Sequence, residues 1–241
     1  MLNKSTFKIF VDFDGTITVK DVGEEIFLHF GDPSKAKKIV KDWIDEKINS
    51  IQTWELLCKT VNNLSLEEFD SFIDSMCIQP TFLNFIDYCK LNNFQIWILS
   101  DGLDYYIKRI LSKEKISYLN FYSNKLIFGK NNELIPFFPY TDEECKSCAN
   151  CKRNHIIEHS SDDDFSVYIG DGYSDTCPAQ FCDFIFAKNS LLKYCEKNRI
   201  SYYPFKDFSD IIKKLEELKN KKHLRKRHQA VLKRKEVYMQ G

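Results

Sequence analysis

Short apolar runs alternate with helical periodicity along most of the chain. Four runs are apolar enough to predict strands buried on both faces, and they cover residues 7–11, 94–99, 164–169 and 184–187. Apolar side chains at three- and four-residue spacing predict helices over residues 81–90, 103–113, 191–197 and 207–218. Residues 119–139 differ, because short apolar runs around Gly129 predict a hairpin or an excursion from the core. Strands that alternate with helices are typical of a parallel sheet, so the pattern predicts an α/β fold.

A helical stretch interrupts this alternation between the first two strands. Apolar residues from Val22 to Phe30 recur at helical spacing, and the sequence Gly31-Asp32-Pro33 ends that run. Further helices are predicted over residues 34–46, after Ser50, and after Ser65-x-x-Glu68, which has the form of a capping box. The predicted boundaries are an α/β core of residues 1–18 and 90–218, a helical cap of residues 19–89, and a tail of residues 219–241.

The charges of the chain are unevenly distributed, although their sum is zero. Between Lys219 and Gly241 nine Lys or Arg residues face one Glu, a net charge of about +8, which leaves about −8 on the preceding residues. We expect this tail to be a solvated basic helix. Binding to nucleic acid, to an anionic membrane or to the acidic body of the protein are the alternatives. No base-reading motif accompanies the charges, which makes a nucleic-acid partner unlikely.

Cysteine usage and hydropathy bear on the compartment. The nine cysteines are an odd number and favour a reducing environment. No apolar stretch is long enough to span a membrane, and the first residues lead directly into a strand, so we expect a cytoplasmic protein. The oligomeric state cannot be predicted from these features.

Three of the cysteines, Cys145, Cys148 and Cys151, are regularly spaced. They suggest either a structural Zn²⁺ site or reduced thiols that line a loop. The zinc site would need a fourth ligand, with Cys177, His155 and His159 as candidates. Because the usual second Cys-x-x-Cys pair is missing, reduced thiols are the expected state.

Carboxylates and small residues follow three of the predicted strands. Asp12 and Asp14 come after the first strand, and if strand geometry persists to Asp14, both side chains project to the same side. Ser100 follows the second strand, and Asp171 follows the third. Because the carboxyl ends of parallel strands meet at one edge of the sheet, we expect these residues to converge. Buried acids are costly unless their charge is used, and a metal ion together with a phosphate ester would use it.

Together these segments resemble the haloacid dehalogenase-like (HAD) phosphatases. The pattern Asp12-Phe13-Asp14-Gly15-Thr16 is similar to the first motif of this superfamily, Ser100 to the second, Lys152 to the third and residues 170–175 to the fourth. The resemblance covers residues 7–218. It implies a Rossmann-like parallel sheet with a helical-bundle cap inserted after the first strand. It also implies a Mg²⁺-dependent enzyme that hydrolyses phosphate monoesters of small metabolites.

The resemblance also implies a role for each motif residue. Asp12 would attack phosphorus to give an aspartyl-phosphate, and Asp14 would protonate the leaving alcohol and later activate water. Mg²⁺ would be held by the carboxylates of Asp12 and Asp171 and by the backbone carbonyl of Asp14. The remaining roles are phosphate binding by Ser100 and the amides of Asp101 and Gly102, charge neutralisation by Lys152, with Lys146 as the rival lysine, and orientation of the metal's surroundings by Asp175.

The substrate is less well specified than the reaction. Several segments, among them Cys151-Lys152-Arg153 and residues 186–188 and 204–208, resemble the methionine-salvage phosphatases that act on 2-hydroxy-3-keto-5-methylthiopentenyl-1-phosphate. The Ser100-Asp101 pair and residues 170–178 are closer to phosphocholine, phosphoethanolamine and pyridoxal-phosphate phosphatases. Phosphoserine phosphatase is a more distant relative, whose second motif usually carries glycine where this chain has Asp101.

Residues near the motifs offer a shortlist for substrate selection. The acids are Asp21, Glu24 and Asp104, and the aromatic candidates are Trp43 and Trp54. Acids with aromatic faces would suit an amine or choline head group, although aromatics at helical spacing usually pack in a core. Phosphotransfer to an alcohol and a non-catalytic binding module that uses the basic tail are the other hypotheses about function.

Overall fold

The computed structural model describes residues 6–240. The chain forms two compact units. Each unit is assembled from stretches that are far apart in the sequence. The first contains Met1–Asp12, Gln79–Leu99 and Lys152–Gly241, and the second contains Phe13–Ile78 and Ser100–Cys151. The chain therefore crosses from one unit to the other after Asp12, after Leu99 and after Cys151, which lie close in sequence to several predicted motif residues.

The first unit is built on parallel strands. In spatial order these are β2 (Gln95–Leu103), β1 (Phe7–Val11), β5 (Phe165–Gly170), β6 (Phe184–Ala187) and β7 (Tyr203–Pro204). The four longer strands confirm the predicted ones, and the short β7 was not predicted. Val11 pairs with both Ile98 and Ile169, so the neighbouring strands of β1 reach the same edge with it. This register places Asp12 at the carboxyl edge of the sheet.

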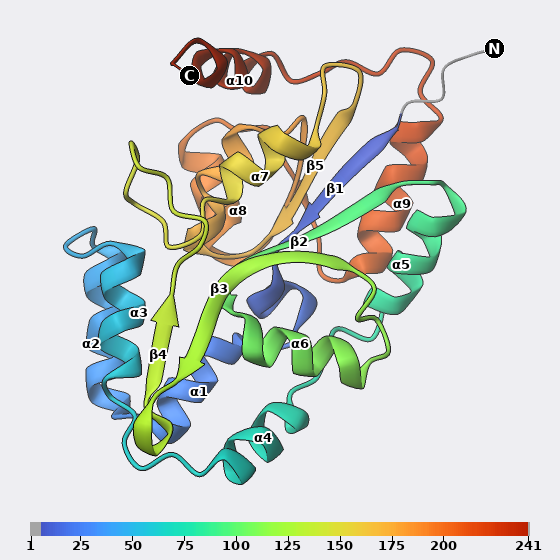
Figure 1. Cartoon of the computed structure of the whole chain (residues 1–241). Coiled ribbons are helices and arrows are strands. Elements are labelled where there is room, and N and C mark those ends of the chain that lie inside the picture. Colours follow the sequence, from blue (N-terminus) through green and yellow to red (C-terminus); the bar gives the residue numbers. More distant parts are fainter. Residues whose placement is uncertain (1–5, 241) are drawn as a thin grey trace. The chain divides into compact units, whose positions relative to one another are not determined.

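Helices cover this sheet. They are α5 (Phe82–Leu91), α7 (Lys152–His159), α8 (Asn189–Lys197) and α9 (Phe208–Lys219). Helices α5 and α9 lie side by side (Figure 1), and Phe208 joins them through ring contacts of 4.9 Å with Phe82 and 5.1 Å with Phe85. Trp97 of β2 stacks on His159 of α7 with their ring centroids 4.9 Å apart. The predicted α/β class is confirmed.

The second unit contains the helices predicted between the first two strands. They are α1 (Val22–Phe30), α2 (Pro33–Ile44), α3 (Ser50–Cys58) and α4 (Leu66–Ser75), and α6 (Asp104–Lys113) joins them. Side chains cap the first four helices, as when Ser65 accepts a hydrogen bond from the amide of Glu68. The predicted hairpin is confirmed as the antiparallel pair β3 (Asn120–Phe128) and β4 (Leu134–Phe137).

The division into compact units does not follow the predicted domain boundaries. The unit that holds the inserted helices also holds residues 100–151, which include α6 and the hairpin. Compactness alone does not establish which residues form a cap, so the boundaries stay a prediction. Across residues 6–240, every helix is too short or too polar to cross a membrane.

The basic tail forms a helix that packs against the first unit. Helix α10 (His228–Gln240) buries Ala230 and Arg234. The guanidinium of Arg234 lies 3.2 Å from a carboxylate oxygen of Asp183 and donates to the carbonyl of Phe181 at 2.5 Å. Asp183 also accepts from the amide and the hydroxyl of Ser166 in β5, at 3.0 and 2.9 Å. The expected solvated helix is therefore wrong for this face, and the alternative that the tail folds onto the acidic body is confirmed.

We predict that Arg234→Ala lowers the free energy of unfolding by about 3 kcal/mol, because it leaves Asp183 buried without its counterion. The two hydrogen bonds from Ser166 should limit the loss to this value. Urea unfolding followed by circular dichroism measures the effect. Lys235→Ala is the matched control, because Lys235 is exposed on the same helix. Equal unfolding midpoints for the two variants would contradict the prediction.

Candidate active site

The chain turns sharply after β1 and carries its two acids into different units. β1 ends at Val11, and residues 13–17 form a tight turn in which Gly15 has a φ of 71°, a conformation that favours glycine. Asp12 belongs to the first unit and Asp14 to the second. The condition that strand geometry continues to Asp14 is therefore not met, because the turn begins one residue after Asp12.

In the first unit, Asp12 is paired with a buried lysine. The ammonium of Lys152, at the start of α7, lies 2.6 Å from Asp12 and 2.7 Å from Asp175, and it donates to the hydroxyl of Ser174 at 3.2 Å. Burial alone would lower the pKa of Lys152, but the two carboxylates outweigh it and raise the pKa above its ordinary value. Lys152 is thus a fixed cation beside Asp12, whereas the rival Lys146 is exposed.

Asp175 is held from several directions. One carboxylate oxygen accepts from Lys152 and from the hydroxyl of Tyr168 at 2.6 Å, and the other accepts from the amides of Asp171 and Gly172, both at 2.9 Å. A Cβ at Gly170 would lie 2.5 Å from this second oxygen, so only glycine fits there. Four donors on one carboxylate hold Asp175 in a fixed orientation. Tyr168 was not predicted, since a tyrosine in a buried strand has no distinguishing sequence signal.

Three carboxylates in this unit fit a divalent cation. Asp12, Asp171 and Asp175 each offer an oxygen, and these oxygens lie within 4.8 Å of one another. Three negative charges face Lys152, and Lys188 also interacts electrostatically with Asp171 and Asp12, which still leaves a negative excess that a divalent ion would balance. All-oxygen donors are those that Mg²⁺ prefers. The donor set therefore fits the predicted Mg²⁺.

The cysteine cluster does not form a comparable site. Cys145 is exposed, Cys148 half-buried and Cys151 buried. Among residues 6–240, the three aspartates are the sole group of His, Cys, Asp or Glu side chains close enough to share a metal ion. A structural Zn²⁺ site at the three cysteines is therefore not supported.

In the second unit, three donors converge on Asp14. The hydroxyl groups of Tyr106 and Ser100 donate to one carboxylate oxygen at 2.9 and 3.1 Å, and the amide of Val22 donates to the other at 3.1 Å. Burial raises the pKa of Asp14, and these hydrogen bonds oppose the rise only in part. A carboxyl with a raised pKa can hold a proton nearer to neutral pH, as a general acid must.

Gly102 makes room for this arrangement. A Cβ at this position would lie 1.7 Å from the hydroxyl of Tyr106 and 2.7 Å from a carboxylate oxygen of Asp14. The amide of Gly102 donates to Ser100 Oγ at 2.9 Å, which orients the hydroxyl that contacts Asp14. The sequence placed residues 100–102 after the second strand, but β2 continues through Leu103. Tyr106 was not predicted, because it resembles any core residue on an amphipathic helix.

The shortlisted substrate residues have internal partners. Asp21 caps α1 by accepting from the amide of Glu24 at 2.8 Å. Asp104 accepts from the amide of Leu126 at 2.9 Å and pairs with Lys108 at 2.6 Å. The ring of Trp54 packs against Phe27 at 5.8 Å. Capping, hairpin attachment and core packing therefore account for three of the five candidates.

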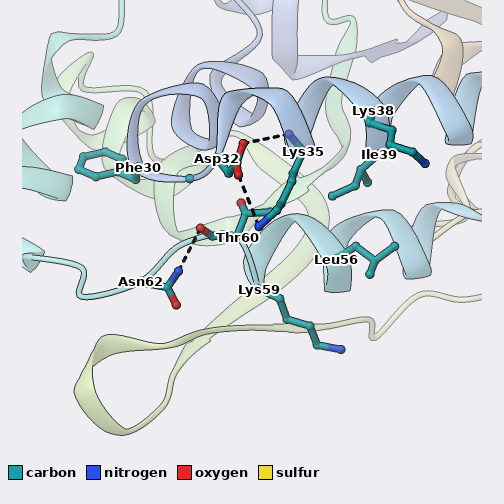
Figure 2. Close-up of a pocket in the computed structure, with 10 residues that line it drawn as sticks. Phe30, Asp32, Lys35, Lys38, Ile39, Leu56, Lys59, Thr60 and Asn62 are labelled. Atoms are coloured by element: carbon teal, nitrogen blue, oxygen red, sulfur yellow. Dashed lines mark hydrogen bonds and ion pairs between the residues drawn. The ribbon is translucent and has the colours of Figure 1, made fainter.

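A separate pocket lies between α2 and α3. It has a volume of 580 Å³, and Figure 2 shows Lys35, Lys38 and Lys59 around it. Asp32 partly offsets this charge by pairing with Lys35 at 3.5 Å. None of the motif residues lines this pocket, so the pocket is not part of the candidate active site.

Comparisons with known proteins agree with this chemistry. The Putative Phosphatase family model matches residues 7–201. The 2-hydroxy-3-keto-5-methylthiopentenyl-1-phosphate phosphatase of Bacillus mycoides is 30% identical over 219 residues, covering 88% of this chain and 97% of that protein. The enzyme of the same name from Lysinibacillus sphaericus is 30% identical over 224 residues, covering 89% and 96%.

Solved structures show the same fold. A phospho-aspartyl intermediate analogue of phosphoserine phosphatase has a TM-score of 0.68 at 20% identity, and it covers 88% of this chain and 99% of that one. A substrate-bound phosphoserine phosphatase has a TM-score of 0.64 at 22% identity with the same coverage. The family match spans most of the chain, and the chain therefore belongs to the Putative Phosphatase family of the HAD superfamily and is a phosphoric monoester hydrolase.

Proposed function

We propose that this protein is a Mg²⁺-dependent phosphatase that hydrolyses 2-hydroxy-3-keto-5-methylthiopentenyl-1-phosphate through an aspartyl-phosphate. The observation that carries the mechanism is the buried Lys152, which holds the carboxylate of Asp12 at 2.6 Å among two further aspartates. The proposed substrate rests on the names of the relatives.

Asp12 is the proposed nucleophile. Its contact with Lys152 fixes the orientation of the carboxylate, and the low exposure of both groups, 4% and 3%, strengthens the electrostatic interaction between them. Asp12, Asp171 and the backbone carbonyl of Asp14 would hold Mg²⁺, with Asp175 orienting this group. When bound, the ion supplies positive charge that neutralises a phosphate dianion facing carboxylates. Lys152 provides further positive charge for the phosphoryl oxygens.

Asp14 is the proposed acid and base. Its raised pKa keeps the proton that the leaving alkoxide needs, and Tyr106, Ser100 and the amide of Val22 fix both of its oxygens. After the alcohol leaves, the resulting carboxylate takes a proton from the attacking water. Ser100 and the amides of Asp101 and Gly102 are the proposed phosphate-binding groups.

Covalent connection supports a common role for the two acids. Only Phe13 separates Asp12 from Asp14, so their Cα atoms lie at most about 7.6 Å apart whatever the arrangement of the two units. That span allows one acid to attack phosphorus while the other protonates the leaving oxygen of the same P–O bond. We also propose a cytoplasmic location, because the odd number of cysteines favours a reducing environment.

A phosphate-release panel tests the proposal. The panel contains the methylthiopentenyl phosphate and the phosphates of choline, ethanolamine, pyridoxal, thiamine and serine, each assayed with Mg²⁺ and with chelator. We expect the highest kcat/KM for the methylthiopentenyl compound, and activity that chelator abolishes and added Mg²⁺ restores. A higher kcat/KM for another phosphate would overturn the proposed substrate. Full activity in chelator would overturn the metal dependence, and phosphate recovered on an added alcohol would identify a phosphotransferase.

A further inference from the structure

We infer that Asp101 is a positioning residue that fastens the segment leading into Lys152 to the end of β2 and to the start of α3. This inference rests on the proposed function, in which Ser100 and Lys152 bind the phosphoryl group. The contacts that carry it all lie in the second unit. They involve a carboxylate that the resemblance to phosphatases did not explain.

The side chain of Asp101 accepts from two different elements. One carboxylate oxygen accepts from the amide of Asn150 at 3.0 Å, and the other accepts from the hydroxyl of Ser50, the first residue of α3. The backbone carbonyl of Asp101 accepts from the side-chain amide of Asn124 in β3 at 2.5 Å. Asp101 thus contacts α3, β3 and the segment around Asn150 at once.

Asn150 completes the attachment to β2. Its side chain is buried and donates to the carbonyl of Ser100 at 2.7 Å and to that of Tyr122 at 3.0 Å. Asn150 lies two residues before Lys152, and Ser100 directly precedes Asp101. The network therefore fixes the backbone beside two of the proposed phosphate-binding residues.

The start of α3 is bound to the same segment by its own contacts. The amide of Ser50 donates to the carbonyl of Ser147 at 3.2 Å, and the side chain of Asn49 donates to the carbonyl of Lys146 at 3.3 Å. Residues 146–150 are consequently held both by a helix of the insert and by the end of β2. Asp101 supplies the charged acceptor between them, and hydrogen bonds to a charged acceptor are the stronger ones.

This arrangement has a consequence for substrate selection. Each oxygen of the Asp101 carboxylate accepts a hydrogen bond from the protein. A carboxylate that holds the segment together should affect all phosphates alike, whereas one that recognises a cationic head group should affect phosphocholine and phosphoethanolamine alone. The two roles can therefore be separated by comparing substrates.

The experiment compares Asp101→Ala with Asp101→Asn. We expect Asp101→Ala to lower kcat/KM about 10- to 100-fold for every hydrolysed phosphate. Replacing a residue that orients the groups of a site typically costs activity of this size. Asp101→Asn should lose clearly less kcat/KM than Asp101→Ala, since its amide oxygen can accept from Asn150 and its NH₂ can donate to Ser50. Asp70→Ala is the matched control, because it removes a carboxylate of the same unit whose partners are Tyr105 and Arg109.

Hydrogen exchange provides a readout that does not depend on the substrate. Asp101→Ala should speed exchange of the amide of Asn150, while Asp101→Asn and Asp70→Ala should leave it protected. If wild-type protein hydrolyses none of the phosphates, the proposed function fails, but the exchange result still decides the positioning role. Unchanged protection in Asp101→Ala, equal impairment of the Asn variant, or a loss confined to cationic substrates would overturn the inference.

Discussion

Asp12→Asn is expected to abolish phosphate release, with a loss of at least about 1,000-fold in kcat, equivalent to about 4 kcal/mol of activation free energy. The amide oxygen of asparagine can still accept from Lys152, so the contact at 2.6 Å is retained. What is lost is the anionic oxygen that attacks phosphorus. A neutral amide is too weak a nucleophile to form the phosphorylated intermediate.

Two measurements check this result. Steady-state phosphate release gives the loss of turnover, and acid quenching with labelled substrate should trap a phosphorylated protein in the wild type and none in the variant. Asp163→Asn is the control, because it makes the same chemical change at an exposed position. Turnover by Asp12→Asn within tenfold of the wild type would show that another group attacks phosphorus.

Lys152→Met is expected to impair both catalysis and stability. Loss of one preorganised donor to developing negative charge typically costs about 100- to 1,000-fold in kcat. The substitution also leaves Asp12 and Asp175, which are 4% and 0% exposed, without their counterion. Removing one partner of a buried ion pair costs about 3 to 5 kcal/mol in unfolding free energy.

Mg²⁺ should reduce the loss of unfolding free energy in Lys152→Met, but it should not restore kcat. Without the lysine, the acidic cluster has one more unbalanced negative charge, so the ion should stabilise Lys152→Met more than it stabilises the wild type. Urea unfolding in chelator and in Mg²⁺ measures this difference. Lys146→Met serves as the control, because that lysine is exposed. A variant that unfolds like the wild type in chelator would refute the structural role of the pair.

Strands and helices were predictable because their signals are local. The run at residues 184–187 matches β6, and the periodicity from Val22 to Phe30 matches α1. Burial on both faces of a strand or on one face of a helix leaves a pattern in neighbouring residues. The turn after Asp12 was missed, because the same apolar letters continue through Phe13 while the backbone changes direction.

The candidate site was predictable only where its residues stand in motifs. Asp12, Asp171 and Lys152 were named from the sequence, and the structure brings the first two together with Asp175 and pairs the lysine with Asp12. Tyr106 and Asn150 were not named, although they contact Asp14 and Asp101. Their partners lie 92 and 49 residues away, and a single tyrosine or asparagine carries no signal of such a pairing.

The tail was misjudged for a related reason. A run of lysine and arginine predicts a solvated helix from its composition, and most of its charges fulfil that expectation. Arg234 does not, since it is buried by an ion pair with Asp183 and a hydrogen bond to the carbonyl of Phe181. Composition describes the average residue of such a segment and is silent about one buried exception.

The Arg234–Asp183 pair also constrains the order of events when the protein is made. Asp183 is synthesised 51 residues before Arg234, so β5 and β6 can assemble before this ion pair forms, when the carboxylate has the donors of Ser166 but lacks the guanidinium. Domains generally fold as units during synthesis, but this one reaches its final electrostatic balance only when α10 has emerged. Chains that stop before Arg234 should therefore be degraded by cellular proteases faster than the full chain.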